Sequence, residues 1–152
     1  MVADRFGTLL EELGSLLQIK LAPDENNACK IRYPDKLELT MALDPSTELL
    51  FIIIEIGVPP EGKYRENLFR EALRANGSPG PSQGVFCYAK KTDMLLLFEQ
   101  LTIADLHAPV LAELLQLLCE KAREWKQSIS LGEIPTASIS SSRPSSGIFG
   151  LQ

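Results

Sequence analysis

The segment from Leu49 to Ile56, Leu-Leu-Phe-Ile-Ile-Ile-Glu-Ile, constrains the fold more than any other part of the chain. Every residue in it except Glu55 is apolar, so a strand built from it is hydrophobic on both faces. Strands of this kind lie at the centre of a sheet with both faces covered. We therefore expect this segment to be a central strand. The segment from Met94 to Phe98 has the same character.

The neighbouring segments predict the rest of the sheet. From Cys29 to Tyr33 apolar residues alternate with charged ones, which is typical of a half-buried strand. Leu37 to Leu43 alternates in the same way, and the Pro34-Asp35 turn between the two segments indicates antiparallel pairing. Val85 to Ala89 and Met94 to Gln100 predict a two-strand hairpin.

Three segments have apolar residues at the three- and four-residue spacing of an amphipathic helix: Ala3 to Leu17, Lys63 to Ala75, and Leu106 to Ser128. Asn76-Gly77 predicts a left-handed stop for the second helix, and Asp105 predicts a cap for the third. The expected fold class is therefore α+β, in the order helix, three antiparallel strands, helix, two-strand hairpin, helix.

The length of 152 residues indicates one domain. We expect it to cover residues 1–129. Residues 130–152 are rich in serine and lack periodic apolar residues, and we expect them to form a disordered tail.

Charge and composition exclude several classes of protein. A net charge of −5 argues against nucleic-acid binding, which needs a basic face. The longest apolar run, Leu49 to Ile54, is too short for membrane insertion, and the amino terminus has no secretory signal pattern. Cys29, Cys87 and Cys119 are far apart and are expected to be buried, reduced thiols of a cytoplasmic protein.

The sequence contains no pattern that indicates catalysis. His107 is the only histidine, and it is expected to be a surface or capping residue rather than a catalytic base or a zinc ligand. The loop from Gly77 to Gly84 lacks the lysine and the spacing of a phosphate-binding loop. We therefore expect a binding protein that is not an enzyme and has no cofactor or metal.

The predicted sheet has more apolar surface than the predicted helices cover. Two strands are apolar on both faces, yet three helices must cover a sheet of five strands. Removing apolar surface from water stabilises association by roughly 25 cal/mol per Å², so we expect another chain to cover the excess. The alternative is that the three helices suffice and the protein is monomeric.

The order of these elements and several local motifs resemble the class I type III secretion chaperones. The matching pieces cover residues 3–129: the leucine-rich first helix, Leu49 to Pro60, the helix Leu68 to Asn76 that ends in Ala-Asn, and Ala122-Arg-Glu-Trp-Lys126. The segments that most resemble members from chlamydia-type bacteria are Pro23-Asp24, Asn26-Asn27-Ala28-Cys29, Asn76-Gly77-Ser78-Pro79 and Gln127 to Pro135.

The resemblance implies an α+β sandwich, a dimer through the second helix and the strand after it, and no ATPase activity. It implies that the amino-terminal segment of a secreted effector wraps around the dimer in extended form and is kept competent for export. It places the protein in the bacterial cytoplasm. A homodimer, a heterodimer with a related chaperone, and contact with the secretion ATPase are the further partners that it suggests.

Two sets of residues follow as candidates. The partner-binding groove is expected on the first helix and the second strand, and ordinary core packing is the alternative for each of its residues: Leu9, Leu13, Leu17, Leu37, Leu39 and Met41. An isologous dimer interface is expected on Tyr64, Leu68, Phe69, Leu73, Val85 and Tyr88. Two rival functions stay open: a small regulatory or scaffold protein with the same fold but no secretion cargo, and an enzyme with an unrecognised pocket.

Overall fold

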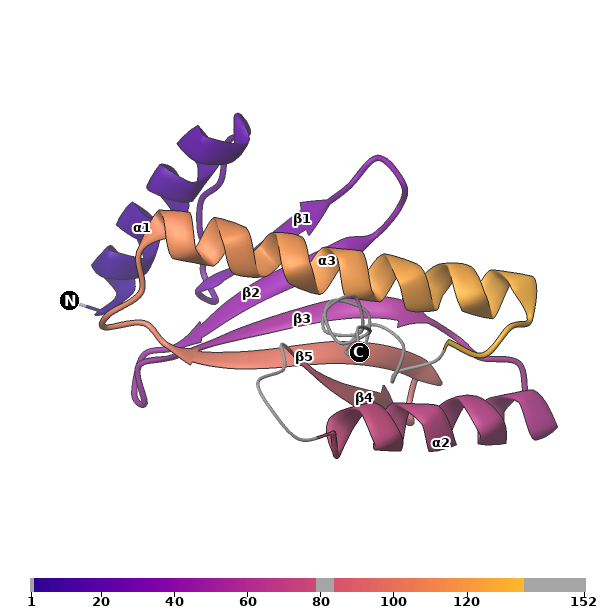
Figure 1. Ribbon diagram of the computed structural model, residues 1–152. Coiled ribbons are helices and arrows are strands. Elements are labelled where there is room, and N and C mark those ends of the chain that lie inside the picture. The colour runs from indigo at the N-terminus through magenta and orange to yellow at the C-terminus, as the bar shows by residue number, and fades with distance from the viewer. Residues whose placement is uncertain (1, 79–83, 136–152) are drawn as a thin grey trace, which may run out of the picture.

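A computed structural model describes residues 2–78 and 84–135 of the chain. Its elements are α1 (Val2–Leu17), β1 (Ala28–Arg32), β2 (Glu38–Asp44), β3 (Leu49–Gly57), α2 (Lys63–Asn76), β4 (Val85–Ala89), β5 (Met94–Thr102) and α3 (Ala108–Leu131). The strands form one antiparallel sheet in the spatial order β1-β2-β3-β5-β4 (Figure 1). The predicted α+β fold and the predicted order of elements are confirmed.

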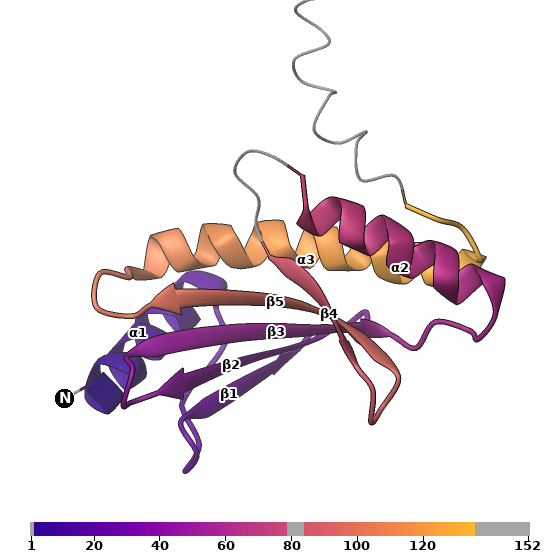
Figure 2. The same cartoon turned by 90° about the horizontal axis from the view of Figure 1, so that it is seen from below.

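One face of the sheet carries the core. Because neighbouring strands are in register, a row of buried side chains crosses all five strands: Ile31, Leu39, Ile54, Leu97 and Phe86. Figure 2 shows α2 and α3 on this side of the sheet. The apolar alternation of each strand therefore points into a layer between sheet and helices.

The two longer helices close this layer. α3 buries a stripe that ends at Trp125, whose ring lies 4.1 Å from the ring of Phe86, centroid to centroid. α1 packs against α3, and Arg5 fastens it there by donating from Nε to the Ile103 carbonyl at 3.0 Å. α3 begins at Ala108 with His107 as its N-cap, so the predicted cap at Asp105 is wrong. Pro109 lies in the first turn, where its fixed φ is favourable, and this places the cap at His107.

The opposite face of the sheet is covered by no helix in the described part of the chain (Figure 2). Phe51 and Ile53 of β3 and Leu96 and Phe98 of β5 point to this face and are half-buried. The rings of Phe51 and Phe98 stack at 5.7 Å. β3 is central, as predicted, but the expectation that both of its faces are covered is wrong within this chain, because all the helix packing is on one side.

The folded chain extends past the predicted domain boundary at residue 129. α3 continues to Leu131, and the Tyr64 hydroxyl donates to the Glu133 carbonyl at 2.7 Å. The serine-rich segment 138–146 lies outside the described residues. Among the described residues there is no helix long and apolar enough to cross a membrane, and no cluster of side chains that could hold a metal ion.

Candidate partner-binding site

The structure buries most of the residues predicted to form the partner-binding groove. Five of them point into the core beneath α1 and α3: Leu9, Leu13, Leu37, Leu39 and Met41. They lie on the covered face of the sheet or on the inner stripe of α1, so a partner could not touch them without displacing a helix. They therefore follow the core-packing alternative rather than form an exposed groove. Leu17, at the end of α1, is only partly buried.

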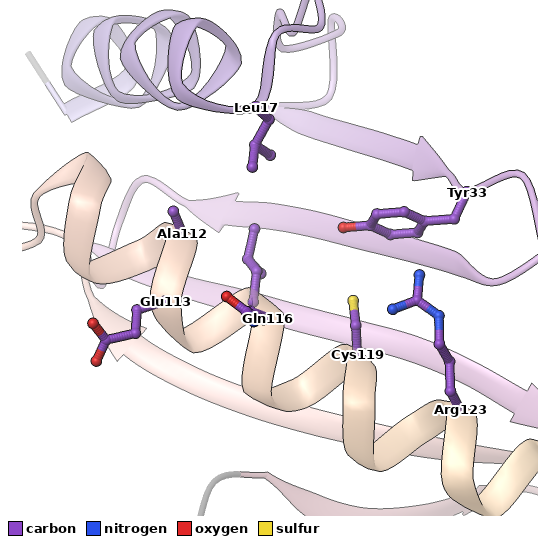
Figure 3. Close-up of a pocket in the computed structure, with 8 residues that line it drawn as sticks. Leu17, Tyr33, Ala112, Glu113, Gln116, Cys119 and Arg123 are labelled. Atoms are coloured by element: carbon purple, nitrogen blue, oxygen red, sulfur yellow. The ribbon is translucent and has the colours of Figure 1, made fainter.

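Leu17 lines a pocket of about 440 Å³ between the end of α1, the residue that follows β1, and α3. Figure 3 shows the side chains of Leu17 and Tyr33 pointing into this space, with α3 on its opposite side. α3 supplies the rest of the lining: Ala112, Glu113, Leu115, Gln116, Cys119 and Arg123. The surface of the pocket is mostly apolar with a few polar groups, a composition that is usual for ligand pockets.

The polar end of the pocket is a connected group of side chains. The Tyr33 hydroxyl hydrogen-bonds the Cys119 thiol, and the Arg123 guanidinium lies 5.0 Å from the centroid of the Tyr33 ring. Burial raises the pKa of both Tyr33 and Cys119, so both stay protonated at neutral pH. Arg123 is also paired with Asp35, and its hydrogen bond lowers the pKa of that carboxyl group. These pairings hold the ring of Tyr33 in place as one wall of the pocket.

The free edge of the sheet lies beside this pocket. Within the described part of the chain β1 pairs only with β2, and two backbone hydrogen bonds show which of its groups face that strand. Leu43 N donates to the Asn27 carbonyl, and Tyr33 N donates to the Leu37 carbonyl, both at 2.9 Å. Because backbone direction alternates along an antiparallel strand, the odd-numbered residues of β1 face β2 and the even-numbered ones face outward.

Three residues therefore turn their N–H and C=O groups to the outer edge of β1. Ala28 is already occupied, since its N–H donates to Asp24 Oδ1 at 3.0 Å and its carbonyl accepts from Asp24 N at 2.8 Å. The backbone groups of Lys30 and Arg32 have no hydrogen-bond partner among the described residues. They form a short edge that is open to an added strand.

The predicted dimer residues differ in their exposure and in their contacts within the chain. Leu68 is fully buried in the core, and the Tyr64 hydroxyl is bonded within the chain to the carbonyls of Ser128 and Glu133. The rings of Phe69 and Tyr88 pack against each other at 4.9 Å. Leu73 is 71% exposed and Val85 is 48% exposed. Leu68 is therefore corrected to a core residue, because it lies on the stripe of α2 that faces the sheet.

Comparison with known proteins places this fold in a class. The chain matches the model of the Tir chaperone protein (CesT) family over residues 8–126. It belongs to that family, which confirms the resemblance to type III secretion chaperones seen in the sequence. Among curated protein sequences, none matches the chain significantly.

Several solved structures share the fold. A HopA1–SchA chaperone–effector complex has a chain with a TM-score of 0.68 and 21% identity, covering 82% of this chain and 95% of its own length. A chain of an ExsC–ExsE complex has a TM-score of 0.66 and 20% identity, and the match covers 84% of this chain and 95% of that chain. A structure of the Yersinia pestis type III secretion chaperone SycH in complex with a fragment of YscM2 has a chain with a TM-score of 0.61 and 21% identity. The match covers 79% of this chain and 98% of that chain. At these identities the likeness is one of fold.

Tyr33, Cys119 and Arg123 belong to the site, although the sequence pattern predicts only a half-buried strand residue at Tyr33 and a buried thiol at Cys119. Cys119 is buried as predicted, whereas Cys87 is exposed, so the prediction of burial is wrong for Cys87. Arg123 and its partner Asp35 are 88 positions apart in the sequence. Only the packing of α3 across the end of β1 brings them together, and no local pattern signals it.

Proposed function

We propose that the chain is a type III secretion chaperone that holds an extended segment of a secreted effector along the outer edge of β1. The open backbone groups of Lys30 and Arg32, beside a pocket of about 440 Å³, are the observation that carries this proposal. An added strand gains main-chain hydrogen bonds at such an edge, while pockets for alternate side chains supply specificity. This function needs no catalytic group, cofactor or metal.

The pocket lies on the face of the sheet to which a side chain of the added strand would point. A residue of the added strand that lies opposite Ile31 points to the same face of the sheet as Ile31 and Tyr33. That is the covered face, and Tyr33 is one wall of the pocket. One apolar side chain of the effector would therefore enter between Leu17 and Cys119. Its burial offsets part of the cost of ordering the segment.

Of the six residues predicted for the groove, Leu17 is the proposed contact. The other five form the core that fixes the positions of α1 and β2. They support the site from beneath, and changes to them are expected to act through stability.

A proline at the open edge tests the proposal. In Lys30→Pro the missing N–H is one that faces outward, so no β1–β2 hydrogen bond is lost, and proline is tolerated on edge strands. Lys30→Ala is the matched control, because both variants lose the ion pair of Lys30 with Glu38, which is 3.5 Å from Nζ to Oε1. The probe is the amino-terminal segment of each secreted protein of the host bacterium, co-expressed with the chain one at a time.

We expect at least one such segment to co-purify with wild type and with Lys30→Ala. The affinity of Lys30→Pro should be lower by about tenfold, the value of one net hydrogen bond, with a melting temperature close to that of Lys30→Ala. Equal affinity of the two variants would rule out pairing at β1. No co-purifying segment at all would contradict the function itself.

We also propose that the protein works as a dimer, formed by the exposed residues on α2 and β4: Leu73, Val85 and Tyr88. The half-buried apolar face of β3 and β5 adjoins β4 and would be partly covered in such an assembly. Contact with the secretion ATPase stays a prediction from the resemblance.

A further inference from the structure

Two cations lie along the free edge of the sheet. Lys30 and Arg32 of β1 point to the face opposite the helices, which we call the open face, because Ile31 between them is buried on the covered face. The Arg32 side chain is 73% exposed and the Lys30 side chain is 47% exposed. Figure 2 shows β1 at the edge of the sheet, on the side away from α2. A strand added to this edge would lie directly beside both cations.

One carboxylate is shared between these two cations. Glu38 Oε2 of β2 lies 3.1 Å from Arg32 Nε, and Glu38 Oε1 lies 3.5 Å from Lys30 Nζ. One negative charge cannot balance two positive ones, so these three side chains carry a surplus positive charge. Glu55 is the register partner of Glu38 on β3. With Glu55 included the formal charges cancel, but the two positive charges are the outermost ones.

Distance decides which of these charges an added strand would meet. The added strand would lie one strand spacing from β1, two from β2 and three from β3, or about 5, 10 and 14 Å. The screening length at physiological ionic strength is about 8 Å. The cations of β1 lie within that length, whereas Glu38 and Glu55 lie beyond it. The edge therefore presents a positive charge to the strand that pairs with it.

The positive part of the edge is short. At its start the Asp24 carboxylate accepts a hydrogen bond from Ala28 N at 3.0 Å, so a negative charge lies there. In the turn after β1, Asp35 is paired with Arg123. Arg32 is the more exposed of the two edge cations and is farther along the strand from Asp24. We therefore expect Arg32 to contribute more to recognition.

We propose that the β1 edge selects an extended segment in which one apolar residue has Asp or Glu on each side. The apolar residue lies opposite Ile31 and points to the pocket, so its two neighbours point to the open face beside Lys30 and Arg32. Opposite charges across a sheet stabilise pairing, and like charges oppose it. Because the pattern is symmetric, it holds for either direction of the segment. The inference rests on the proposed function and adds the chemistry of the segment.

The same charges favour a partner over a second copy of this chain. If two β1 edges paired, Lys30 and Arg32 of one copy would lie beside Lys30 and Arg32 of the other. Like charges directly opposite each other destabilise such a pair, and cations on edge strands commonly protect against it. The edge is therefore closed to its own copy and open to an acidic segment.

Substitutions in a bound segment test the pattern. The probe is the amino-terminal effector segment that co-purifies with the wild-type chain. Its anchor is the apolar residue whose change to alanine weakens binding to wild type but not to Leu17→Ala. We expect Asp or Glu on each side of that anchor. Changing both to lysine should weaken binding to wild type by about tenfold or more, since two favourable pairs become unfavourable.

A charge reversal on the chain separates recognition from a general loss of binding. In Arg32→Glu the preference for the original segment over the lysine-substituted one should fall by about tenfold. Lys63→Glu is the matched control, because Lys63 is 74% exposed and is also paired with a glutamate, Glu66, at 3.3 Å. It should keep the wild-type preference. If the reversal beside Glu38 lowers the melting temperature, Arg32→Gln removes the charge without adding a like one and should still reduce the preference.

The outcomes distinguish this inference from the proposed function. If the wild type binds a segment with no acidic residue beside its anchor, or if lysine substitution leaves the affinity unchanged, the charges of the edge do not select and the inference fails while the function stands. It also fails if Arg32→Glu and Lys63→Glu lose the preference equally, because net charge alone would then account for it. If no segment co-purifies, the proposed function fails and this inference falls with it.

Discussion

Arg123 and Asp35 tie α3 to the turn between β1 and β2. Arg123 Nε donates to Asp35 Oδ2 at 2.7 Å, and both side chains are partly exposed. The same guanidinium lies against the ring of Tyr33. The pair therefore fixes both the free edge of the sheet and one wall of the pocket, and its effects should appear in how stability depends on pH.

We expect Asp35→Asn to make the protein less sensitive to acid. The hydrogen bond from Arg123 lowers the pKa of Asp35 in the folded state. A carboxyl group whose pKa is lowered by folding stabilises the folded state. This contribution is complete at a pH above the pKa of the unfolded state, about 3.9, and it is lost as the pH falls through the pKa of the folded state. Urea midpoints of wild type should therefore fall more steeply below about pH 4 than those of Asp35→Asn. Asp105→Asn, at another exposed position, is the control and should follow wild type. Parallel curves for wild type and Asp35→Asn would contradict the coupling.

Leu13 and Leu17 should behave differently although they are one helical turn apart. Leu13 is fully buried, so Leu13→Ala should lower the free energy of unfolding by about 2–5 kcal/mol. Leu17 lines the pocket and is partly exposed, so Leu17→Ala should cost less than about 1.5 kcal/mol and mainly weaken cargo binding. Denaturant unfolding and cargo affinity, measured on both variants, separate the two roles. Similar stability losses would mean that Leu17 is also core and that the pocket is not a contact site.

The same pair shows what the sequence can and cannot predict. Periodicity identifies both leucines as members of one apolar stripe, and it does so correctly. Periodicity does not reveal that α1 ends at Leu17. Beyond this residue the helix no longer covers the sheet, and the pocket begins. Burial at a helix end depends on which segment packs there, and here that segment is α3, about a hundred residues further along the chain.

The strands were predictable because their signal is local. Alternation in 29–33 and 37–43 and the apolar run of 49–56 specify strands and turns without distant contacts. The hydrogen bonds made at the edges of the sheet were not predictable in this way. Asn76 fits the pattern of a helix stop, yet its hydrogen bonds go to Phe86, and only the folded position of β4 makes that contact possible. Gly77 has φ −93° and ψ 0°, so the left-handed stop predicted at Asn76-Gly77 is not formed. For the same reason the one-sided cover of β3 was missed, because an apolar run does not say whether its second face is covered by the same chain or by another.

Two glycines of α1 should respond in opposite directions to alanine. At Gly14 a Cβ atom would lie 2.5 Å from the carbonyl oxygen of Ile19, where the chain folds back and Ile19 N donates to Gly14 O at 2.9 Å. Gly14→Ala must displace this turn and should destabilise the fold by about 1–3 kcal/mol. At Gly7 no atom beyond the adjacent residues and the helix's own nearby backbone lies within 4 Å of the added Cβ, so Gly7→Ala should stabilise the fold by up to about 1 kcal/mol through helix propensity. Thermal unfolding of both variants checks this. A stabilising Gly14→Ala would mean that the turn at Ile19 moves at little cost.

Leu73 offers the cleanest test of the proposed dimer. Leu68 is buried, so an aspartate there, alone or with one at Phe69, would unfold the chain whatever its oligomeric state. Leu73 is 71% exposed on the same helix, so the monomer should tolerate Leu73→Asp. In an isologous dimer the substitution acts twice, once from each copy, and buried apolar contacts are replaced by two charges. The dimer should therefore dissociate at concentrations at which wild type is associated.

The matched control is Val110→Asp, which introduces the same charge at a residue that is 60% exposed at the start of α3. Sedimentation at several concentrations should show monomers for Leu73→Asp and the wild-type distribution for Val110→Asp, with both variants retaining the circular dichroism of wild type. If Leu73→Asp sediments as wild type does, the interface does not include the outer side of α2, and the half-buried face of β3 and β5 becomes the surface to test. If instead Val110→Asp dissociates the protein, the copies meet at α3, which is the helix that also lines the pocket beside β1.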